Sequence, residues 1–477
     1  MLTVGQVLVG LMWIGLLVLA CSVLRTRMLW ARRLFLPSSL LAGVVALLAG
    51  PEVFGALFGH VFEDGAGLFP GYVYDTWSAL PGLLISVVFA ALFLGKPIPG
   101  LRAIWLRAGP QVVVGQTMAW GQYVVGILLA LLVLTPVFGL SPMAGALIEI
   151  GFEGGHGTAA GMAGTFEDLG FPEGADLALG LATVGLLAGV IGGTILINIA
   201  ARRGIVSPES GSDDAARPSV EEQAELEKDY RHERSTTDPL SVHLGLVGLA
   251  VLAGWALLTA LQALESATWA RDGGVEILAH VPLFPMAMVG GVFIQLVVMR
   301  LGYEEHVSGR TMQRISGFAL DFTIVAALAT LSLQALGEHL VPFLLLAATG
   351  IAWSLLVLMV LAPRVIPYNW FERGVGDFGQ SMGVTVTGVL LMRMADPRNE
   401  SGALESFGYK QMLFEPIVGG GLFTAASVPL IYQFGPVAVL IGTAVVTVGW
   451  IIFGLLYFGR MVPDGGRGRW RPGGPAQ

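Results

Sequence analysis

Long uncharged apolar runs recur along this 477-residue chain, and they constrain its fold more than any other feature. Each run has about 17–25 residues, enough for a helix to cross roughly 30 Å of hydrocarbon. Only 13% of the residues are charged, whereas a soluble protein has about 25%. The ~10-residue alternating segments of a membrane barrel do not occur. The sequence therefore predicts an all-α polytopic membrane protein.

The apolar runs predict eleven membrane spans and two irregular segments. The spans cover residues 4–24, 34–50, 78–95, 111–139, 176–200, 241–262, 281–299, 317–336, 342–363, 411–434 and 436–459. Two more apolar segments, 143–165 and 374–395, contain several glycines and are too broken for ordinary spans. The single cysteine, Cys21, lies in the first run and excludes both an intramolecular disulfide and a thiolate metal site.

Basic residues predict the orientation of these spans, because short cytoplasmic loops are rich in lysine and arginine. Such residues follow the first, third, fifth, seventh and ninth spans, and four arginines form the tail. Odd-numbered spans therefore end in the cytoplasm, with the N-terminus outside and the C-terminus cytoplasmic. This works only if 143–165 and 374–395 are re-entrant hairpins that open to opposite sides of the membrane.

A polar stretch at residues 201–240 divides the chain into two similar parts. It carries ten acidic and six basic residues, which predicts a solvated cytoplasmic linker. Residues 1–200 and 241–435 each contain four spans, a broken hairpin and one more span, in opposite topology. We therefore predict an inverted repeat of two five-helix halves, the plan of many secondary transporters. The span at 436–459 is an additional C-terminal helix.

Faint internal similarity supports the repeat. The six-residue spacing of Pro37 and Gly43 recurs at Pro285 and Gly291. The hairpins match as well, with the pattern acid-x-Gly-His at 153–156 and acid-x-Gly-Gln at 377–380.

The two hairpins carry the candidate binding residues. Broken helices survive in hydrocarbon only inside protein or beside a water-filled cavity. Helix N-termini there offer free N–H groups to an anion, and unwound carbonyls with hydroxyls suit sodium, which prefers oxygen ligands. The candidate substrate- and ion-binding residues are Glu153, Gly154, Gly155, His156, Gly157, Thr158, Asp377, Gly379, Gln380, Ser381, Gly383, Thr385 and Thr387. The candidate sodium ligands among them are Thr158, Ser381, Thr385 and Asp377.

These residues also have purely structural interpretations. The glycines can serve close helix packing alone, and His156 can be a hydrogen-bonded interior histidine. Glu153 and Asp377 point more strongly to function, because acids inside a membrane are costly. Asp321 and Glu415 also lie within apolar spans. Asp321 can face water near the cytoplasmic end of its span, and Glu415 can cap the second hairpin.

Signals of catalysis are poor. No H-E-x-x-H, G-x-S-x-G or P-loop pattern occurs, and the seven histidines lack metal-ligand spacing. We therefore expect no enzyme, no cofactor and no nucleic-acid partner. Two alternatives stay open: an intramembrane enzyme that uses His156 with Glu153, and a channel or sensor. Aromatic residues near predicted span ends, such as Trp30, Trp77 and Tyr123, are interpreted as interface anchors.

Four motifs resemble those of the sodium/glutamate symporter family. The family's first-hairpin signature resembles G-G-H-G-T-A at 154–159, and the helix after it resembles A-T-V-G-L-L-A-G-V-I-G-G at 182–193. The second hairpin resembles M-G-V-T-V-T-G at 382–388, and the last common helix resembles M-L-F-E-P-I-V-G-G-G-L-F at 412–423. The motifs occur in the family's order, and the similarity covers roughly residues 1–435.

This resemblance implies a homodimeric symporter of the cell inner membrane that imports glutamate, or a related small organic anion, with a sodium gradient. It implies two inverted five-helix repeats, a scaffold domain, and a moving domain that holds the hairpins and works like an elevator. The 2-hydroxycarboxylate transporters are similar in fold. The family's substrate and ion region falls on residues 154–158 and 379–387.

Two features depart from the family pattern. Glu153 and Asp377 place acids where glutamate carriers are expected to be uncharged, and a fixed acid disfavours a dicarboxylate unless a cation or proton compensates it. The extra helix at 436–459 turns the C-terminus into the cytoplasm. The sequence therefore leaves open the substrate and the choice between sodium and protons as the coupling ion.

Overall fold

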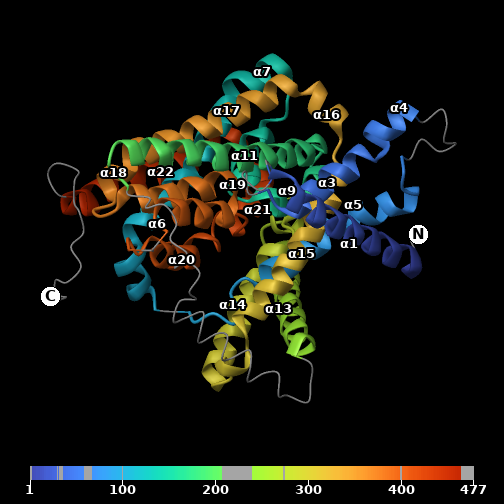
Figure 1. Ribbon diagram of the computed structural model, residues 1–477, viewed down its shortest axis with the longest axis horizontal. Coiled ribbons are helices and arrows are strands. Elements are labelled where there is room, and N and C mark those ends of the chain that lie inside the picture. Colours follow the sequence, from blue (N-terminus) through green and yellow to red (C-terminus); the bar gives the residue numbers. More distant parts are fainter. Residues whose placement is uncertain are drawn as a thin grey trace. The chain divides into compact units, whose positions relative to one another are not determined.

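Every regular element is a helix in the part of the chain that the computed structural model describes (Figure 1). That part comprises residues 3–29, 31, 36–58, 67–98, 100–206, 239–271, 274–397 and 400–462. Within it, ten helices are long and apolar enough to cross a membrane: Val4–Arg27, Ser38–Phe58, Gly71–Ala91, Ile104–Phe138, Glu173–Arg202, Leu240–Ala267, Leu283–Leu301, Gly309–Ala329, Leu340–Val365 and Pro436–Met461. The predicted all-α, multi-pass class is confirmed. Most of the predicted linker at 201–240 lies outside the described residues, as does Trp30.

The prediction of one unbroken span over residues 411–434 is wrong. Two helices occupy this range instead of one. Helix α20 (Ala403–Phe414) ends within it, and α21 (Leu422–Phe434) begins after an irregular stretch at residues 415–421. Gly419 and Gly420 in this stretch have φ angles of 72° and 99°, which glycine adopts without the steric cost of a side chain. The helix ends just before Pro416, which has no N–H to continue it, and the glycines then keep the chain irregular inside an otherwise apolar run.

Three other spans begin at least seven residues earlier than predicted. The span predicted at 317–336 is α15 (Gly309–Ala329), the one predicted at 78–95 is α5 (Gly71–Ala91), and the one predicted at 111–139 begins with α6 (Leu101–Leu129). The Ser308 hydroxyl caps α15 by accepting a hydrogen bond from the Thr311 amide at 3.2 Å. The sequence prediction places Arg310, in the first turn of α15, in a loop because it is basic. A long basic side chain can also lie at a helix end and reach water.

The chain forms two compact units, and each combines segments from both sides of the polar stretch. The first unit takes its described residues from Met1–Ile98, His156–Gly180 and Pro218–Leu340. The second takes them from Pro99–Gly155, Leu181–Arg217 and Val341–Gln477. Three of the described helices pass from one unit to the other along the sequence: α9 (Gly155–Gly161), α11 (Glu173–Arg202) and, by its first residue only, α17 (Leu340–Leu356).

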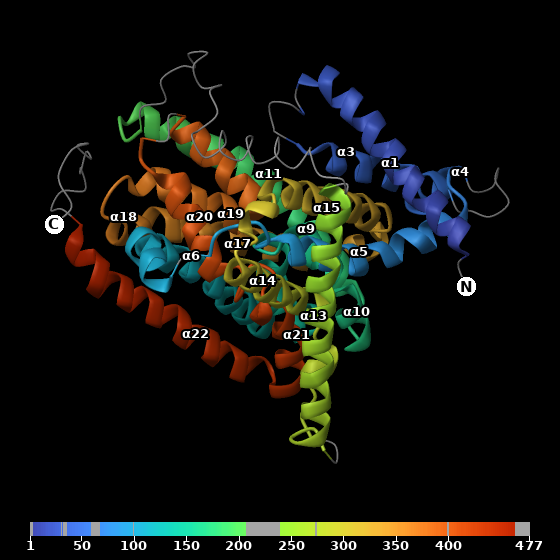
Figure 2. The same ribbon diagram turned by 90° about the horizontal axis from the view of Figure 1, so that it is seen from below.

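The first unit is built mainly from long helices with apolar contacts. It contains α1 (Val4–Arg27), α3 (Ser38–Leu48), η1 (Pro51–Gly55), α4 (Ala56–Phe58), α5, α10 (Ala163–Asp168), α13 (Pro239–Ala267), η5 (Leu278–His280), α14 (Leu283–Leu301), η6 (Glu304–His306), α15 and α16 (Leu333–Glu338). Helices α13 and α14 lie side by side (Figures 1 and 2), α14 packs on α5, and α15 packs on both α5 and α3.

Glycines bring helices of the first unit close together at two corresponding places. A Cβ on Gly43 of α3 would lie 2.7 Å from the Cβ of Leu328 on α15. A Cβ on Gly291 of α14 would lie 2.3 Å from the carbonyl oxygen of Ala90 on α5. These two glycines are the pair that the sequence comparison matched, and both allow close helix contact.

Trp77 is not an interface anchor. Its side chain is fully buried in the first unit, among Ile14, Phe69 and Val325. The indole Nε1–H donates a hydrogen bond to the Gly10 carbonyl oxygen at 2.9 Å. The position of a tryptophan near a predicted span end was therefore a poor guide to its contacts, because the interior of the unit also offers a carbonyl to the indole.

The second unit surrounds α6 (Leu101–Leu129). The other elements are η2 (Ala130–Leu134), α7 (Thr135–Phe138), η3 (Pro142–Ala146), α8 (Leu147–Phe152), the C-terminal part of α11, α17 (Leu340–Leu356), η7 (Val357–Leu361), α18 (Ala362–Val365), α19 (Trp370–Ala395), α20, α21, α22 (Pro436–Phe453), η8 (Gly454–Phe458) and η9 (Gly459–Met461). Helices α19, α20 and α22 all pack on α6 (Figure 2).

Candidate functional site

Helix α19 reverses its direction near its middle. Gly383 and Val384 have non-helical backbone angles, and the segments on either side of them pack against each other. A Cβ on Gly379 would lie 2.9 Å from the Cα of Gly388, although nine residues of straight helix would separate them by about 13 Å. A Cβ on Gly376 would likewise lie 2.5 Å from the sulfur of Met392. α19 is therefore two short helical segments joined by a tight turn.

The turn itself is strained. Val384 has φ 63° and ψ 171°, a region that is essentially restricted to glycine and that costs a branched residue about 1–3 kcal/mol. The Thr387 hydroxyl donates a hydrogen bond to the Gly383 carbonyl oxygen at 2.5 Å. Backbone strain of this kind persists only where surrounding contacts hold it, and it is enriched at functional sites.

Helix α11 makes room for this turn. Its glycines at 185, 189 and 193 recur every fourth residue and so share one face. A Cβ on Gly185 would lie 2.2 Å from the Met382 carbonyl oxygen, and one on Gly193 would lie 2.4 Å from Leu391. The glycine-rich motif of α11 thus has a packing role, because any larger residue would push the tip of α19 away.

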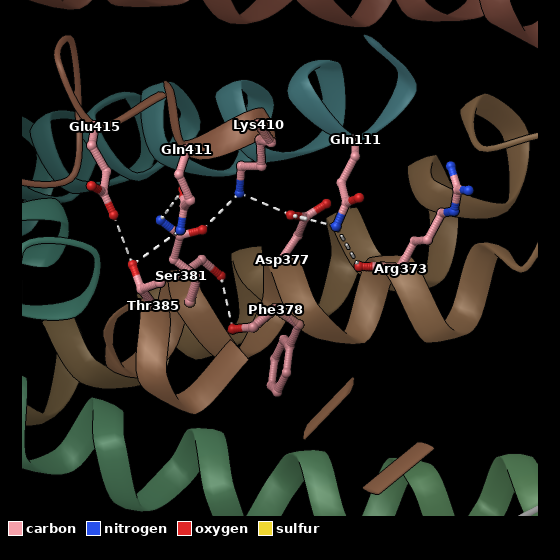
Figure 3. Close-up of polar contacts among 10 residues, drawn as sticks. Gln111, Arg373, Asp377, Phe378, Ser381, Thr385, Lys410, Gln411 and Glu415 are labelled. Atoms are coloured by element: carbon pink, nitrogen blue, oxygen red, sulfur yellow. Dashed lines mark hydrogen bonds and ion pairs between the residues drawn. The ribbon is translucent and has the colours of Figure 1, made fainter. Parts of the chain in front are cut away.

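A chain of hydrogen bonds joins α19 to α20 (Figure 3). The Lys410 ammonium donates to Asp377 Oδ1 and to Gln380 Oε1, each at 2.8 Å. The Gln380 amide donates to Gln411 Oε1 at 3.1 Å. The Lys410 and Asp377 side chains are only 1% and 0% exposed, so this is a buried ion pair.

The chain continues to the irregular stretch after α20. The Gln411 amide donates to the Thr385 hydroxyl at 3.0 Å, and that hydroxyl donates to Glu415 Oε1 at 2.9 Å. Thr385 lies one residue after the strained turn, and Glu415 directly follows α20. The two broken regions of the second unit therefore share one hydrogen-bond network.

Gln111 of α6 forms the other end of the network. Its amide nitrogen lies 3.4 Å from Asp377 Oδ1 and 3.2 Å from the Arg373 carbonyl oxygen. Asp377 Oδ2 and Gln111 Oε1 are buried and accept no hydrogen bond from the described residues. The Lys410 ammonium also lies 4.2 Å from the centre of the Phe414 ring, within the range of a cation–π contact.

Glu149 forms a second polar centre. Its Oε1 accepts hydrogen bonds from the Gly419 amide at 2.7 Å and the Thr424 hydroxyl at 2.8 Å, and its Oε2 accepts one from the Tyr123 hydroxyl at 2.5 Å. Tyr123 is fully buried, so its interpretation as an interface anchor is wrong. The Glu149 carboxylate thus ties α8 to the unwound stretch before α21.

Glu153 is a third buried carboxyl group in the second unit. It is 3% exposed, and its Oε2 has no hydrogen-bond partner in the described part of the chain. It lies within electrostatic range of the side chains Lys410, Glu149, Asp377 and Glu415. Four buried acidic residues, Glu153 included, and one buried lysine therefore make up this set, an arrangement that is costly without hydrogen bonds or counter-ions.

The predicted first-hairpin residues fall into different units. Glu153, Gly154 and Gly155 belong to the second unit, and His156, Gly157 and Thr158 belong to the first. In the second unit, Gly155 has φ 68°, and a Cβ there would lie 2.2 Å from Cγ1 of Val384, at the α19 turn.

The first-unit residues of this hairpin are buried. Gly157 packs on Ile85, with a would-be Cβ at 2.6 Å, and His156 is 7% exposed. The Thr158 side chain is 0% exposed, and its hydroxyl has no partner within the described residues.

The predicted second-hairpin residues serve two purposes. Asp377, Gln380 and Thr385 belong to the hydrogen-bond network. The remaining ones shape the turn and its packing: Gly379, Ser381, Gly383 and Thr387. The Ser381 hydroxyl donates to the Phe378 carbonyl at 3.1 Å, and the Ser381 carbonyl accepts from the Gln122 amide at 2.8 Å.

Sequence reasoning missed six side chains of the two polar centres: Lys410, Gln411, Gln111, Tyr123, Glu149 and Thr424. Lys410 directly precedes a predicted span, where a lysine is usually interpreted as facing the membrane surface. The available signal for Glu149 was its position inside an apolar segment, which was the criterion applied to Glu153 four residues later.

The ten apolar helices of the described residues indicate a multi-pass membrane protein, and broken helices around a buried polar network are typical of membrane transporters. The sodium/glutamate symporter family model matches residues 102–395, well over half of the chain, and the protein belongs to that family. The predicted resemblance is thereby confirmed. No curated protein matches the chain. Membership in a symporter family is consistent with the expectation that the protein is not an enzyme.

Proposed function

We propose that the protein is a secondary active transporter that couples cation movement to the uptake of glutamate or a related small organic anion. The observation that carries the proposal is the buried network between the reversed helix α19 and the unwound stretch after α20. In a membrane-spanning chain, unwound backbone persists only inside protein or beside a water-filled cavity, and buried charge there usually marks a substrate or ion path. Family membership supplies the substrate class and sodium as the leading coupling ion.

The balance of buried charge supports cation coupling. Glu149, Glu153, Asp377 and Glu415 outnumber the one buried lysine of the second unit, Lys410. A carboxylate substrate would meet repulsion there unless cations or protons neutralise part of the charge. The assignment of sodium to Thr158, Ser381, Thr385 and Asp377 belongs to this proposal, and a proton is the alternative coupling ion.

The same proposal includes an elevator-like mechanism. The first unit, with its apolar helix contacts, would be the scaffold, and the second, which holds the buried network, would move. The glycine contacts at Gly43 and Gly291 support an inverted repeat, because each joins the second span of one half to the third span of the other. Re-entrant hairpins, a homodimer in the inner membrane and an outside N-terminus complete the proposal.

Uptake into proteoliposomes tests this function. Purified protein is reconstituted, and radiolabelled glutamate is supplied with an inward sodium gradient, an inward proton gradient, both, or neither. Accumulation above the external concentration that collapses with an ionophore supports the proposal. Downhill flux that ignores both gradients would indicate a channel, and chemical conversion of the substrate would indicate an enzyme. A panel of amino acids and carboxylates then identifies the substrate.

A further inference from the structure

The Lys410 ammonium lies where the surrounding groups would suit a metal cation. Two oxygens, Asp377 Oδ1 and Gln380 Oε1, each lie 2.8 Å from Nζ. One is a carboxylate oxygen and the other an amide oxygen, the ligand types that hard cations prefer. The site is closed to solvent, since the lysine and aspartate side chains are 1% and 0% exposed.

This site has more acceptors than the lysine uses. Asp377 Oδ2 and Gln111 Oε1 are buried and accept no hydrogen bond from the described residues. The Gln111 amide nitrogen lies 3.4 Å from the other Asp377 oxygen, so these groups belong to one cluster. A buried acceptor without a donor is costly, and a cation with several oxygen ligands would satisfy more of them than an ammonium does.

Helix α6 leaves room for the lysine stem. A Cβ on Gly115 would lie 2.4 Å from Lys410 Cε and 2.6 Å from Nζ, so a side chain there would displace the ammonium. Lys410 also lies beyond residues 102–395, the stretch that the family model matches. The charge of Lys410 is thus contributed by a segment outside that shared pattern.

We infer that Lys410 is a tethered cation that takes the place of one metal ion at Asp377. The wild-type protein then needs no sodium at this position, so Asp377 is removed from the sodium ligands assigned above. A sodium ion occupies the position only when the lysine side chain is removed. This inference deepens the proposed function, because it specifies how the cation charge at the α19 site is supplied.

Two substitutions distinguish a tethered cation from an ordinary buried ion pair. Lys410→Ala removes the charge and opens the volume of the stem. Lys410→Met also removes the charge, but its side chain fills most of that volume. An ion pair with only a structural role predicts that neither variant responds to sodium, whereas a tethered cation predicts a response in the alanine variant alone.

Thermal unfolding of the purified proteins in sodium chloride, potassium chloride and choline chloride measures the response. We expect the Tm of Lys410→Ala to rise by about 2–5 °C when sodium replaces choline at equal ionic strength, because a ligand bound only to the folded state stabilises it. The wild-type and Lys410→Met proteins should show no such additional rise. The double variant Lys410→Ala with Asp377→Asn should lose the response, since its carboxylate ligand is gone.

The outcomes separate cleanly. Recovery of folded Lys410→Ala by sodium but not by choline supports the inference even if that variant is unfolded in choline. The inference is overturned if the Tm of Lys410→Ala responds to sodium no more than that of wild type. It is also overturned if Lys410→Ala stays unfolded in every salt, whether or not Lys410→Met folds. The salt response does not depend on uptake, so a wild-type protein that fails to accumulate any substrate would refute the proposed function and leave this result standing.

Discussion

Glu265 of the first unit and Asp377 of the second are buried acids with different partners. In the first unit, the Glu265 carboxylate accepts hydrogen bonds from three successive backbone amides, those of residues 277, 278 and 279, at 2.8, 3.1 and 3.1 Å. In the second, Asp377 meets the side chains of Lys410 and Gln111. Backbone amides of one loop hold the Glu265 carboxylate, whereas Asp377 is held by side chains from two other helices. The difference teaches that Glu265 fixes a loop, while Asp377 belongs to the network of the candidate site.

Neutralising one buried acid in each unit tests this contrast most strongly. Asp377→Asn leaves the Lys410 ammonium buried without its carboxylate partner, which should lower the free energy of unfolding by about 3–5 kcal/mol and abolish gradient-driven uptake. Glu265→Gln weakens the bonds to backbone amides and should cost about 1–3 kcal/mol, with uptake per folded molecule retained. Thermal unfolding and proteoliposome uptake, normalised to folded protein, measure both quantities.

The contrast between the units is wrong if Asp377→Asn transports normally. It is equally wrong if Glu265→Gln, once corrected for the folded fraction, is as inactive as Asp377→Asn. The double variant Asp377→Asn with Lys410→Met provides a further control, because it removes both charges of the pair. It should be more stable than Asp377→Asn alone, since the lysine charge is no longer buried without its carboxylate partner.

Glycines at helix contacts give the next largest effect. A Cβ on Gly291 meets the rigid backbone carbonyl of Ala90 at 2.3 Å, so Gly291→Ala should cost about 1–3 kcal/mol of stability. A Cβ on Gly43 meets the Leu328 side chain, which can partly shift, and Gly43→Ala should cost less. Gly248→Ala on α13 is the matched control, because no atom lies within 4 Å of a Cβ there.

The control should be neutral or stabilising by up to about 1 kcal/mol, since alanine favours helix more than glycine. Thermal unfolding ranks the three variants. An equal loss of stability in all three variants would show that the cost of a side chain does not depend on these close helix contacts.

Hydropathy predicted most helices of both units, because a span must be long and apolar whatever it packs on. It failed over residues 411–434, where composition stays apolar while Pro416 and the glycines at 419–421 interrupt the helix. A window average records how apolar a segment is and not whether its backbone stays helical. Hydropathy also missed the start of α15, because arginines in its first turns lower the average although the backbone is helical.

The site was predicted in part for a different reason. Asp377 and Thr385 were found because polar residues among glycines in an apolar segment are rare. Lys410 was not, because its partner Asp377 lies 33 residues away in the sequence and nothing local marks the pair. The strain at Val384 was also invisible, since a valine in a glycine- and threonine-rich stretch favours no turn by itself.

The strained turn of α19 gives the smallest expected effect and sharpens the contrast within the second unit. Val384→Gly relieves a conformation that costs a valine about 1–3 kcal/mol, but it loses the contact with Gly155 and adds chain entropy of about 1 kcal/mol. We expect a net stabilisation of at most about 1 kcal/mol. Val386→Gly, two residues later in the same hairpin, removes a side chain that is 70% exposed from a helical position, and it should destabilise by about 1 kcal/mol.

Opposite signs for these two valine-to-glycine changes, measured by thermal unfolding, would locate the strain at residue 384 itself. A loss of stability in both would mean that the Val384 side chain contributes more through its contact with Gly155 than its backbone costs. The turn would then be held by packing, as the helices of the first unit are. A gain at residue 384 would instead show that the second unit keeps a strained backbone next to its buried charges, and that the reversal in α19 is retained at the expense of stability.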